Sequence, residues 1–517
     1  MSDSNNQQDD AARRQRRARP SSLDIPDDMM QALSDGAVKL VTDYFARVPE
    51  LDIFPKGTAE ELATLVLGDH AELPLDGRKL DEVLADCRVI MSESRHNGQS
   101  RFFGYVASPS TPVGAYADLL ASALNANVTS WRSAPAATVS EKTVVRWLST
   151  LIGYGADAEG LLTSGGSLAN LNALFIAHRS RASGQVSRRG LWGETRMTLY
   201  ASDQIHMSIP KAADVLGLGR DQLRLVKTDA RFRLDVRDLR ERIKADIKEG
   251  LKPFCVVASA GTVNTGAVDP LAEIARICAE YDLWFHVDGA YGALGSLDER
   301  KRTLFDGIAR ADSVSLDPHK WLYAPVDCGC LLFRDAAQAE RAFATNDADY
   351  IKVHEEATGE SFAFWDYGLE LSRRFRALKI WMMLSYYGER RVRAAVSEDN
   401  DMAAYFAECI NAAEDFELLA PVELSICCFR YVPPGIRQRL AETDDAAERA
   451  RLGAELDALN ARIMHSVQRG GRAYISNVTL NGSYGLRACI INFRTTPEDI
   501  VVTLEIVREA ARAIIKE

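Results

Sequence analysis

Residues 254–295 read FCVVASAGTVNTGAVDPLAEIARICAEYDLWFHVDGAYGALG. The segment contains two short apolar runs, FCVVASA and LWFHVDGA, and between them apolar residues recur every three or four positions. A strand, a helix and a second strand in this order predict a right-handed crossover between parallel strands. The segment therefore predicts an α/β fold with a mostly parallel sheet that is buried between helices.

The same alternation extends over about 160–335, where further short apolar runs include MTLYAS (197–202), SVSL (313–316) and GCLLF (329–333). The chain before this region has helical periodicity, and the chain after it is helical and then contains short strand-like runs. These changes predict four parts: a disordered tail 1–24, an N-terminal helical segment 25–111, a large α/β domain 112–378 and a small C-terminal α+β domain 379–517.

Composition excludes several classes of protein. The 517 residues include 62 basic and 73 acidic ones, and the resulting net charge of −11 argues against nucleic acid or an anionic membrane as the main partner. The nine cysteines form no CxxC pair and no Cys/His cluster, so no metal site is expected and a reducing cytoplasm fits best. Residues 1–22 are polar without an apolar core, which favours a solvated tail over a secretory signal. No apolar run reaches the ~18 residues that a membrane span needs.

Glycines and polar residues follow several of the predicted strands. In LLTSGGSLANLNALFIAHR (161–179), Gly165, Gly166 and Ser167 lie between a strand and a helix, where backbone N–H groups can bind a phosphate. His206 and Thr262 each follow another strand. Each of these features taken alone is more often structural, because glycine turns, lone histidines and loop threonines are common.

Asp288 directly follows an apolar strand, and Lys320 lies just past another strand in an apolar neighbourhood. A carboxylate at such a place needs a cationic or hydrogen-bonding partner, and a structural pair with Arg or Lys is one explanation for Asp288. Lys320 is expected to be desolvated, with a lowered pKa that makes its amine a nucleophile, although a lysine with a buried stem and a solvated head is the alternative. Together, a phosphate turn, a ring partner, a buried aspartate and a buried lysine are the parts that pyridoxal 5′-phosphate (PLP) requires.

The most specific motif is DPHKWL (317–322), preceded by HVDGAYG (286–292). With these motifs the chain resembles the group II PLP-dependent amino-acid decarboxylases, and within them the aromatic-L-amino-acid decarboxylases most. The resemblance covers nearly all of the chain from about residue 25. It implies the fold of type I PLP enzymes and a homodimer with the cofactor near the interface.

The resemblance also implies roles for individual residues. Lys320 is the Schiff-base lysine, Asp288 the partner of the pyridine nitrogen and His206 the residue that stacks on the ring. The other residues implied to contact the cofactor are Gly165, Gly166, Ser167, Thr262, Ala290, Asp317 and His319.

Three further segments resemble the family. NDADYIKVHEE (346–356) matches a mobile loop whose tyrosine donates a proton after decarboxylation, which implies Tyr350 as the acid. Arg487 is implied to meet the substrate carboxylate. RFFGYVASPSTP (101–112) matches a loop that lines the substrate pocket, so Tyr105 and Ser108 are candidate contacts.

Departures from the family pattern concern the substrate. The aromatic enzymes have Asn where this chain has Asp317, a change read here as neutral, and phenylalanines where Val106, Thr129 and Val326 stand. The expected activity is decarboxylation of an L-amino acid. The HKWL motif (319–322) favours the aromatic class of substrate. The alternatives are a decarboxylase of an acidic or other polar amino acid, an oxidative aldehyde synthase, an aminotransferase or lyase, and a non-catalytic PLP-binding protein.

Overall fold

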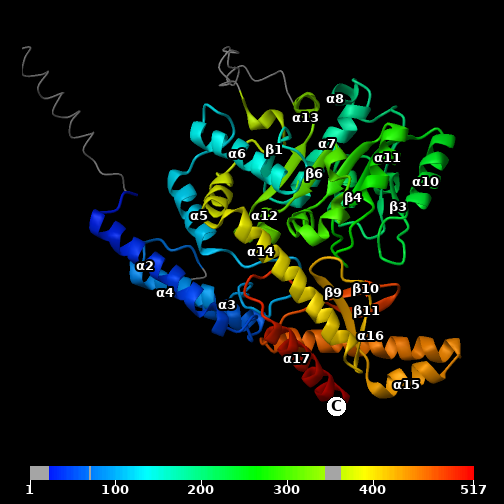
Figure 1. The fold of residues 1–517 in the computed structure, drawn as a ribbon. Helices are drawn as coiled ribbons and strands as arrows, with labels where there is room; N and C mark the ends of the chain where they lie inside the picture. Colours follow the sequence, from blue (N-terminus) through cyan, green and yellow to red (C-terminus); the bar gives the residue numbers. More distant parts are fainter. Residues whose placement is uncertain (1–22, 69–71, 344–361, 517) are drawn as a thin grey trace, which may run out of the picture. The chain divides into compact units, whose positions relative to one another are not determined.

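A computed structural model describes residues 23–68, 72–343 and 362–516 (Figure 1). The chain forms two compact units, one from residues up to Leu51 together with Gly57–Ser94, the other from Asp52–Lys56 and Arg95 onwards.

The first unit is helical. Its elements are α2 (Asp27–Arg47), the 3-10 helix η1 (Val48–Glu50), α3 (Ala59–Leu67) and α4 (Leu80–Ser92). Thr58 begins α3 with a capping box, in which its side chain accepts from the Glu61 N–H and the Glu61 carboxylate accepts from the Thr58 N–H. Several apolar side chains of this unit are exposed, among them Met29, Met30, Leu33, Val83 and Ile90. The helices therefore present apolar surface that this unit does not bury itself.

The second unit is built on a seven-stranded sheet with the order β1-β7-β6-β5-β4-β2-β3. Strands β3, β2, β4, β5 and β6 are parallel, and β7 runs antiparallel to both β6 and β1. The bounds are β1 (Glu159–Thr163), β2 (Met197–Ser202), β3 (Leu223–Val226), β4 (Lys252–Ser259), β5 (Trp284–Asp288), β6 (Ser313–Leu316) and β7 (Gly329–Phe333). The prediction of an α/β fold with a mostly parallel, buried sheet is confirmed.

Helices pack against this sheet and complete its core. The crossover predicted from 254–295 is present as β4, helix α11 and β5, with β4 and β5 adjacent and parallel. The helices are α5 (Pro112–Leu124), α6 (Pro135–Leu151), α7 (Gly166–Arg181), α8 (Val186–Arg189), α9 (Ser208–Val215), α10 (Val236–Lys248), α11 (Leu271–Tyr281), α12 (Pro318–Trp321) and α13 (Ala336–Phe343). Short 3-10 helices are η3 (Arg220–Gln222), η4 (Ala293–Leu297), η5 (Glu299–Phe305), η6 (Ile308–Arg310) and η7 (Phe364–Asp366).

A smaller antiparallel sheet, with the order β10-β11-β9-β8, lies toward the C-terminus. Its strands are β8 (Phe416–Leu418), β9 (Ile426–Tyr431), β10 (Ser476–Leu480) and β11 (Ser483–Cys489). The long helix α14 (Ala377–Asn411), which is interrupted at Gly388, runs from beside α5 and α12 toward this sheet (Figure 1). The remaining helices are α15 (Pro434–Glu442), α16 (Ala446–Arg469) and α17 (Pro497–Lys516).

Within the described ranges, no helix combines the length and the apolar character that crossing a membrane requires. In the same part of the chain, no three His, Cys, Asp or Glu side chains gather closely enough to hold a metal ion.

Candidate active site

The carboxyl ends of five strands meet at one edge of the large sheet and deliver the residues singled out in the sequence. Gly165 and Gly166 follow β1, His206 follows β2 and Thr262 follows β4. Asp288 is the last residue of β5, and Lys320 lies in α12, directly after β6. This is the edge at which ligands of open α/β sheets bind.

Asp288 is a buried carboxylate, 7% exposed, whose hydrogen-bond donors are all neutral. Its Oδ2 accepts from Asn170 Nδ2 at 2.9 Å, and its Oδ1 accepts from the Ala290 N–H at 3.1 Å and from Ser315 Oγ at 3.2 Å. These donors fix the carboxylate without neutralising it, which leaves it able to pair with a cationic group.

Asn170 connects Asp288 to His206 through a chain of buried side chains. Its Nδ2 also donates to Ser208 Oγ at 3.0 Å, and Ser208 Oγ lies 2.9 Å from His206 Nδ1. Its Oδ1 lies 3.0 Å from His286 Nε2. Burial lowers the pKa of His206, although Asp288 opposes the shift, so the imidazole is mostly neutral at pH 7.

Sequence reasoning missed Asn170 and Ser208. Asn170 lies in α7, one turn after the glycine turn, on the face of the helix that is buried against the sheet. A polar side chain on that face of a predicted helix was the available signal, because buried polar groups need partners.

The turn between β1 and α7 requires glycine at Gly166. A Cβ there would lie 2.8 Å from the Ala290 Cβ and 3.0 Å from Asp317 Oδ2, closer than side chains tolerate. The start of α7 is thereby brought against Ala290 and Asp317, while Ser167 stays exposed. The first N–H groups of a helix have no partners within the helix, so this turn can bind an anion.

Lys320 does not have the lowered pKa that its apolar neighbourhood predicts. Its Nζ lies 2.8 Å from Asp317 Oδ2, and the two side chains are 20% and 3% exposed. Burial lowers the pKa of Lys320, but the charge and hydrogen bond of Asp317 outweigh burial and raise the pKa above its ordinary value. The expectation of a lowered pKa was therefore wrong, because it considered desolvation without an ion-pair partner three residues away.

Buried contacts fix the turn that carries Lys320. Trp321 Nε1 and Tyr323 OH donate to Asp399 Oδ2 of α14 at 2.9 Å and 2.7 Å. The Trp321 ring stacks on Tyr291, with centroids 5.2 Å apart. Burial raises the pKa of Asp399 to about 7, although the two donors oppose the shift. Asp399 is a third residue that sequence reasoning missed.

His319 lies in the same turn, and Ser108 of a distant loop contacts it. His319 Nδ1 lies 2.7 Å from the Cys328 carbonyl oxygen, and burial lowers its pKa. Ser108 Oγ donates to the His319 carbonyl at 3.1 Å, so the loop predicted to line the pocket is attached to α12. Thr262 is buried, and its Oγ1 lies 3.0 Å from Thr265 Oγ1.

Arg487 reaches the site from β11 of the small sheet. Its Nε donates to the Asn264 carbonyl at 3.1 Å and its Nη1 to the Tyr105 carbonyl at 2.7 Å. Its Nη2 is buried without a hydrogen-bond partner among the described residues. Cys489, two residues later, interacts electrostatically with both Arg487 and Lys320. A buried guanidinium with one unused donor is suited to bind a carboxylate.

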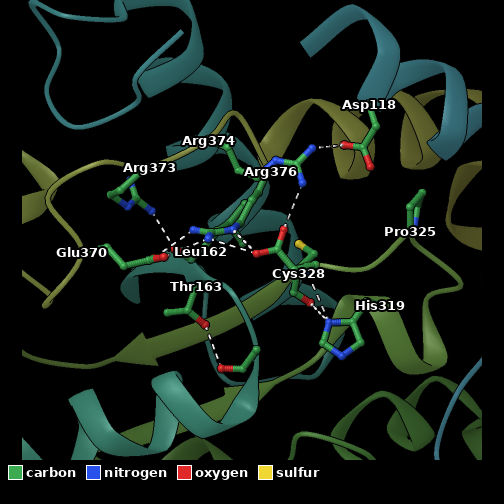
Figure 2. A network of polar contacts seen from close by, with 12 residues as sticks. Asp118, Leu162, Thr163, His319, Pro325, Cys328, Glu370, Arg373, Arg374 and Arg376 are labelled. Carbon is green, nitrogen blue, oxygen red and sulfur yellow. Dashed lines mark hydrogen bonds and ion pairs between the residues drawn. The ribbon is translucent and has the colours of Figure 1, made fainter. Parts of the chain in front are cut away.

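Three arginines of LSRRFRALKIW (371–381) belong to a network of ion pairs with neighbouring segments (Figure 2). Arg376 pairs with Glu370 at 2.8 Å and with Asp327 at 3.1 Å. Arg374 lies 3.4 Å from Asp327, and Arg373 pairs with the fully buried Glu141. The segment after residue 361 is therefore fixed against the loop that follows α12.

Tyr350, the predicted proton donor, lies outside the described residues. The other predicted site residues are all described. Contacts link Gly166, His206, Asp288, Ala290, Asp317 and Lys320, whereas Thr262 contacts Thr265 and Ser167 is exposed.

Known proteins are similar to this chain over most of its length. The model of the pyridoxal-dependent decarboxylase conserved domain matches residues 64–432. An aromatic-L-amino-acid decarboxylase of Bacillus atrophaeus is 34% identical over 492 residues, which are 95% of this chain and 97% of that protein. A cysteine sulfinic acid decarboxylase of Mus musculus is 33% identical over 390 residues, 75% of this chain and 78% of that protein.

A solved structure is also similar. The crystal structure of Oryza sativa TDC with PLP and tryptamine superimposes with a TM-score of 0.86 at 27% identity, and the match covers 96% of this chain and 100% of that one.

Proposed function

Since the chain belongs to the pyridoxal-dependent decarboxylases and uses pyridoxal 5′-phosphate, we propose that it converts an aromatic L-amino acid to its amine and carbon dioxide. The observation that supports an aromatic substrate is the exposed apolar surface beside the site residues. Tyr105, Met207 and Val326 are 51%, 61% and 74% exposed. Tyr105 adjoins Arg487, Met207 follows His206, and Val326 lies in the loop after Lys320. Exposed apolar side chains next to a few polar groups suit an apolar substrate side chain.

The site residues fit the cofactor. The glycine turn offers N–H groups to the phosphate, and Gly166 lets this turn pack closely against Ala290 and Asp317. Asp288, which has only neutral donors, can hold a proton on the ring nitrogen. The residues proposed to hold the cofactor are Gly165, Gly166, Ser167, His206, Thr262, Asp288, Ala290, Asp317, His319 and Lys320.

When bound, the cofactor accepts the electron pair that the departing carbon dioxide leaves behind. Lys320 is proposed to bond to the cofactor until the substrate amine replaces it. Arg487 is proposed to orient the substrate carboxylate with its unused Nη2. Tyr350 is proposed to donate the proton to the substrate Cα.

His206→Ala is expected to slow turnover by about 10- to 100-fold, which corresponds to about 1–3 kcal/mol for the loss of a ring that stacks on the cofactor. Affinity for the cofactor should fall with it, which titration of the cofactor-free protein with PLP measures. His178→Ala is the matched control, because burial lowers the pKa of His178 as well, but His178 packs on Phe254 away from the site. An unchanged rate and affinity in His206→Ala would leave the histidine a structural role alone.

One observation favours an acidic substrate instead. Arg95 is exposed, and its guanidinium carbon lies 5.0 Å from the centroid of the Tyr105 ring. A cation next to a pocket residue can bind a second carboxylate or a sulfinate.

A substrate panel decides between the two classes. Purified protein is incubated with phenylalanine, tyrosine, tryptophan, cysteine sulfinate, glutamate and aspartate, and carbon dioxide, amine, hydrogen peroxide and keto acid are quantified. We expect kcat/KM for the best aromatic substrate to exceed that for any acidic one at least about tenfold, or about 1.4 kcal/mol. The reverse order, with activity lost in Arg95→Met, would establish the acidic class. Keto acid without carbon dioxide would indicate an aminotransferase.

We further propose a homodimer in a reducing cytoplasm. Exposed apolar side chains on α2 and α4 support an interface with a second copy, because such surface is rarely left to solvent. All nine cysteines lie in the described part of the chain and none is in a disulfide. Sedimentation equilibrium would give twice the 57.0 kDa chain mass.

A further inference from the structure

We propose that Asp317 is a positioning residue that keeps the amino nitrogen of Lys320 protonated and returns it to one place whenever Lys320 is not bonded to the cofactor. The inference rests on the proposed role of Lys320 as the cofactor lysine and is independent of the substrate class.

The geometry ties the two side chains together. Lys320 Nζ lies 2.8 Å from Asp317 Oδ2, with the carboxylate 3% exposed. The backbone of Asp317 is fixed as well, since its N–H donates to the Ala290 carbonyl at 3.2 Å and its own carbonyl accepts from the Lys320 N–H at 2.9 Å. Neither charge is well solvated, so each depends on the other.

The carboxylate also lies beside the proposed phosphate turn. The Cβ position of Gly166 is 3.0 Å from Asp317 Oδ2 and 3.4 Å from Oδ1, and Oδ1 is buried without a hydrogen-bond partner among the described residues. A carboxylate next to a phosphate is stable only with a cation at hand. Lys320 is that cation. The aromatic enzymes have asparagine at the position of Asp317, and a neutral asparagine needs no cation beside it.

The other groups facing Lys320 do not replace Asp317. Asp288 interacts with Lys320 but is held by its own neutral donors. The Cys489 thiol has its pKa raised by burial to about 11 and is protonated at pH 7. His206 and His319 both have lowered pKa values because of burial and are mostly neutral. Asp317 is thus the carboxylate in contact with Nζ.

Protons are conserved when the substrate amine replaces Lys320 on the cofactor. The substrate arrives as an ammonium and loses a proton when its nitrogen bonds to the cofactor, and the released Lys320 amine gains one. Asp317 stabilises the resulting ammonium and so favours transfer of the cofactor to the substrate. No net proton, oxidant or reductant is required.

The test compares wild type with Asp317→Asn, which keeps the shape and removes the charge. In the cofactor-free full chain, where Lys320 is not bonded to the cofactor, Lys320 is labelled with acetic anhydride from pH 5 to 10 and the product is quantified by mass spectrometry. We expect the midpoint of this labelling to fall by about 1–3 pH units, because an adjacent opposite charge shifts a pKa by that amount. Asp317→Glu, which keeps the charge, should restore part of the shift.

Asp118→Asn is the matched control. Lys379 Nζ lies 2.9 Å from Asp118 Oδ2, and the lysine is fully buried, so this variant removes the same charge from a buried lysine outside the site. Its labelling midpoint should equal that of wild type, and an equal shift in both variants would overturn the inference. Borohydride reduction and peptide mapping locate the cofactor in each protein when the cofactor is bound. Attachment to another lysine overturns the role of Lys320 and this inference with it, whereas attachment to Lys320 with an unchanged labelling midpoint overturns this inference alone.

Discussion

Asp288→Asn is expected to lower kcat about 1,000-fold, or about 4 kcal/mol in the activation barrier, while the fold stays intact. The neutral amide can still accept from the Ala290 N–H and Ser315, so local structure should survive. It cannot hold a proton on the ring nitrogen of the cofactor, and the carbanion left by decarboxylation then loses its main stabilisation. Carbon dioxide release at saturating substrate measures kcat, and thermal unfolding measures the fold.

Asp312→Asn serves as the control for Asp288→Asn. Asp312 is a mostly buried carboxylate just before β6, where it accepts from the Phe285 N–H at 2.7 Å, at the opposite end of that strand from Lys320. This variant should keep kcat within about threefold, or ~0.7 kcal/mol, of wild type. A normal rate in Asp288→Asn with cofactor bound would make Asp288 a structural residue only.

Tyr350→Phe is expected to change the product instead of stopping the reaction. After carbon dioxide leaves, Cα must be protonated before it reacts with oxygen, and a positioned phenol does this. Phenylalanine keeps the ring but supplies no proton. We expect carbon dioxide release to continue while the main product changes from the amine to the aldehyde, with ammonia and hydrogen peroxide formed in air. The prediction depends on the place of Tyr350 in NDADYIKVHEE (346–356), outside the described residues.

Quantifying amine and aldehyde by chromatography, and peroxide by a coupled assay, gives the product ratio. Tyr367→Phe is the control, because Tyr367 stacks on Phe362 and Phe333 in the described segment beyond that loop. It should leave the ratio unchanged. The same ratio and rate in Tyr350→Phe as in wild type would assign the proton to another donor.

The residues that follow strands were predictable from the sequence because local patterns determine them. Apolar runs of four to eight residues separated by helical periodicity predicted the sheet, and Asp288 and Lys320 were found as polar residues directly after such runs. The glycine turn at Gly166 was predictable for a similar reason, since its glycines lie between a strand and a helix. All these signals lie within a few residues of the feature that they predict.

Other parts of the site depend on contacts between distant segments and were not predictable in this way. Asn170 meets Asp288 across 118 residues, and Asp399 meets Trp321 across 78. The prediction of a lowered pKa for Lys320 was wrong for a different reason. Asp317 is close in sequence, but whether its carboxylate points to Nζ is decided by the turn of α12, which periodicity does not describe.

The contact between Arg487 and Tyr105 has a consequence for how the enzyme is made. The two residues are 382 positions apart, so the hydrogen bond between them closes a loop that spans most of the chain. Loops of this size close late in folding, because their entropy must be lost before any contact compensates for it. A chain emerging from the ribosome would complete the sheet edge that holds Asp288 and Lys320 well before β11 is synthesised. The arginine proposed to orient the substrate is thus acquired only once β11 has been synthesised, and a shorter chain that has already folded around the cofactor would lack it.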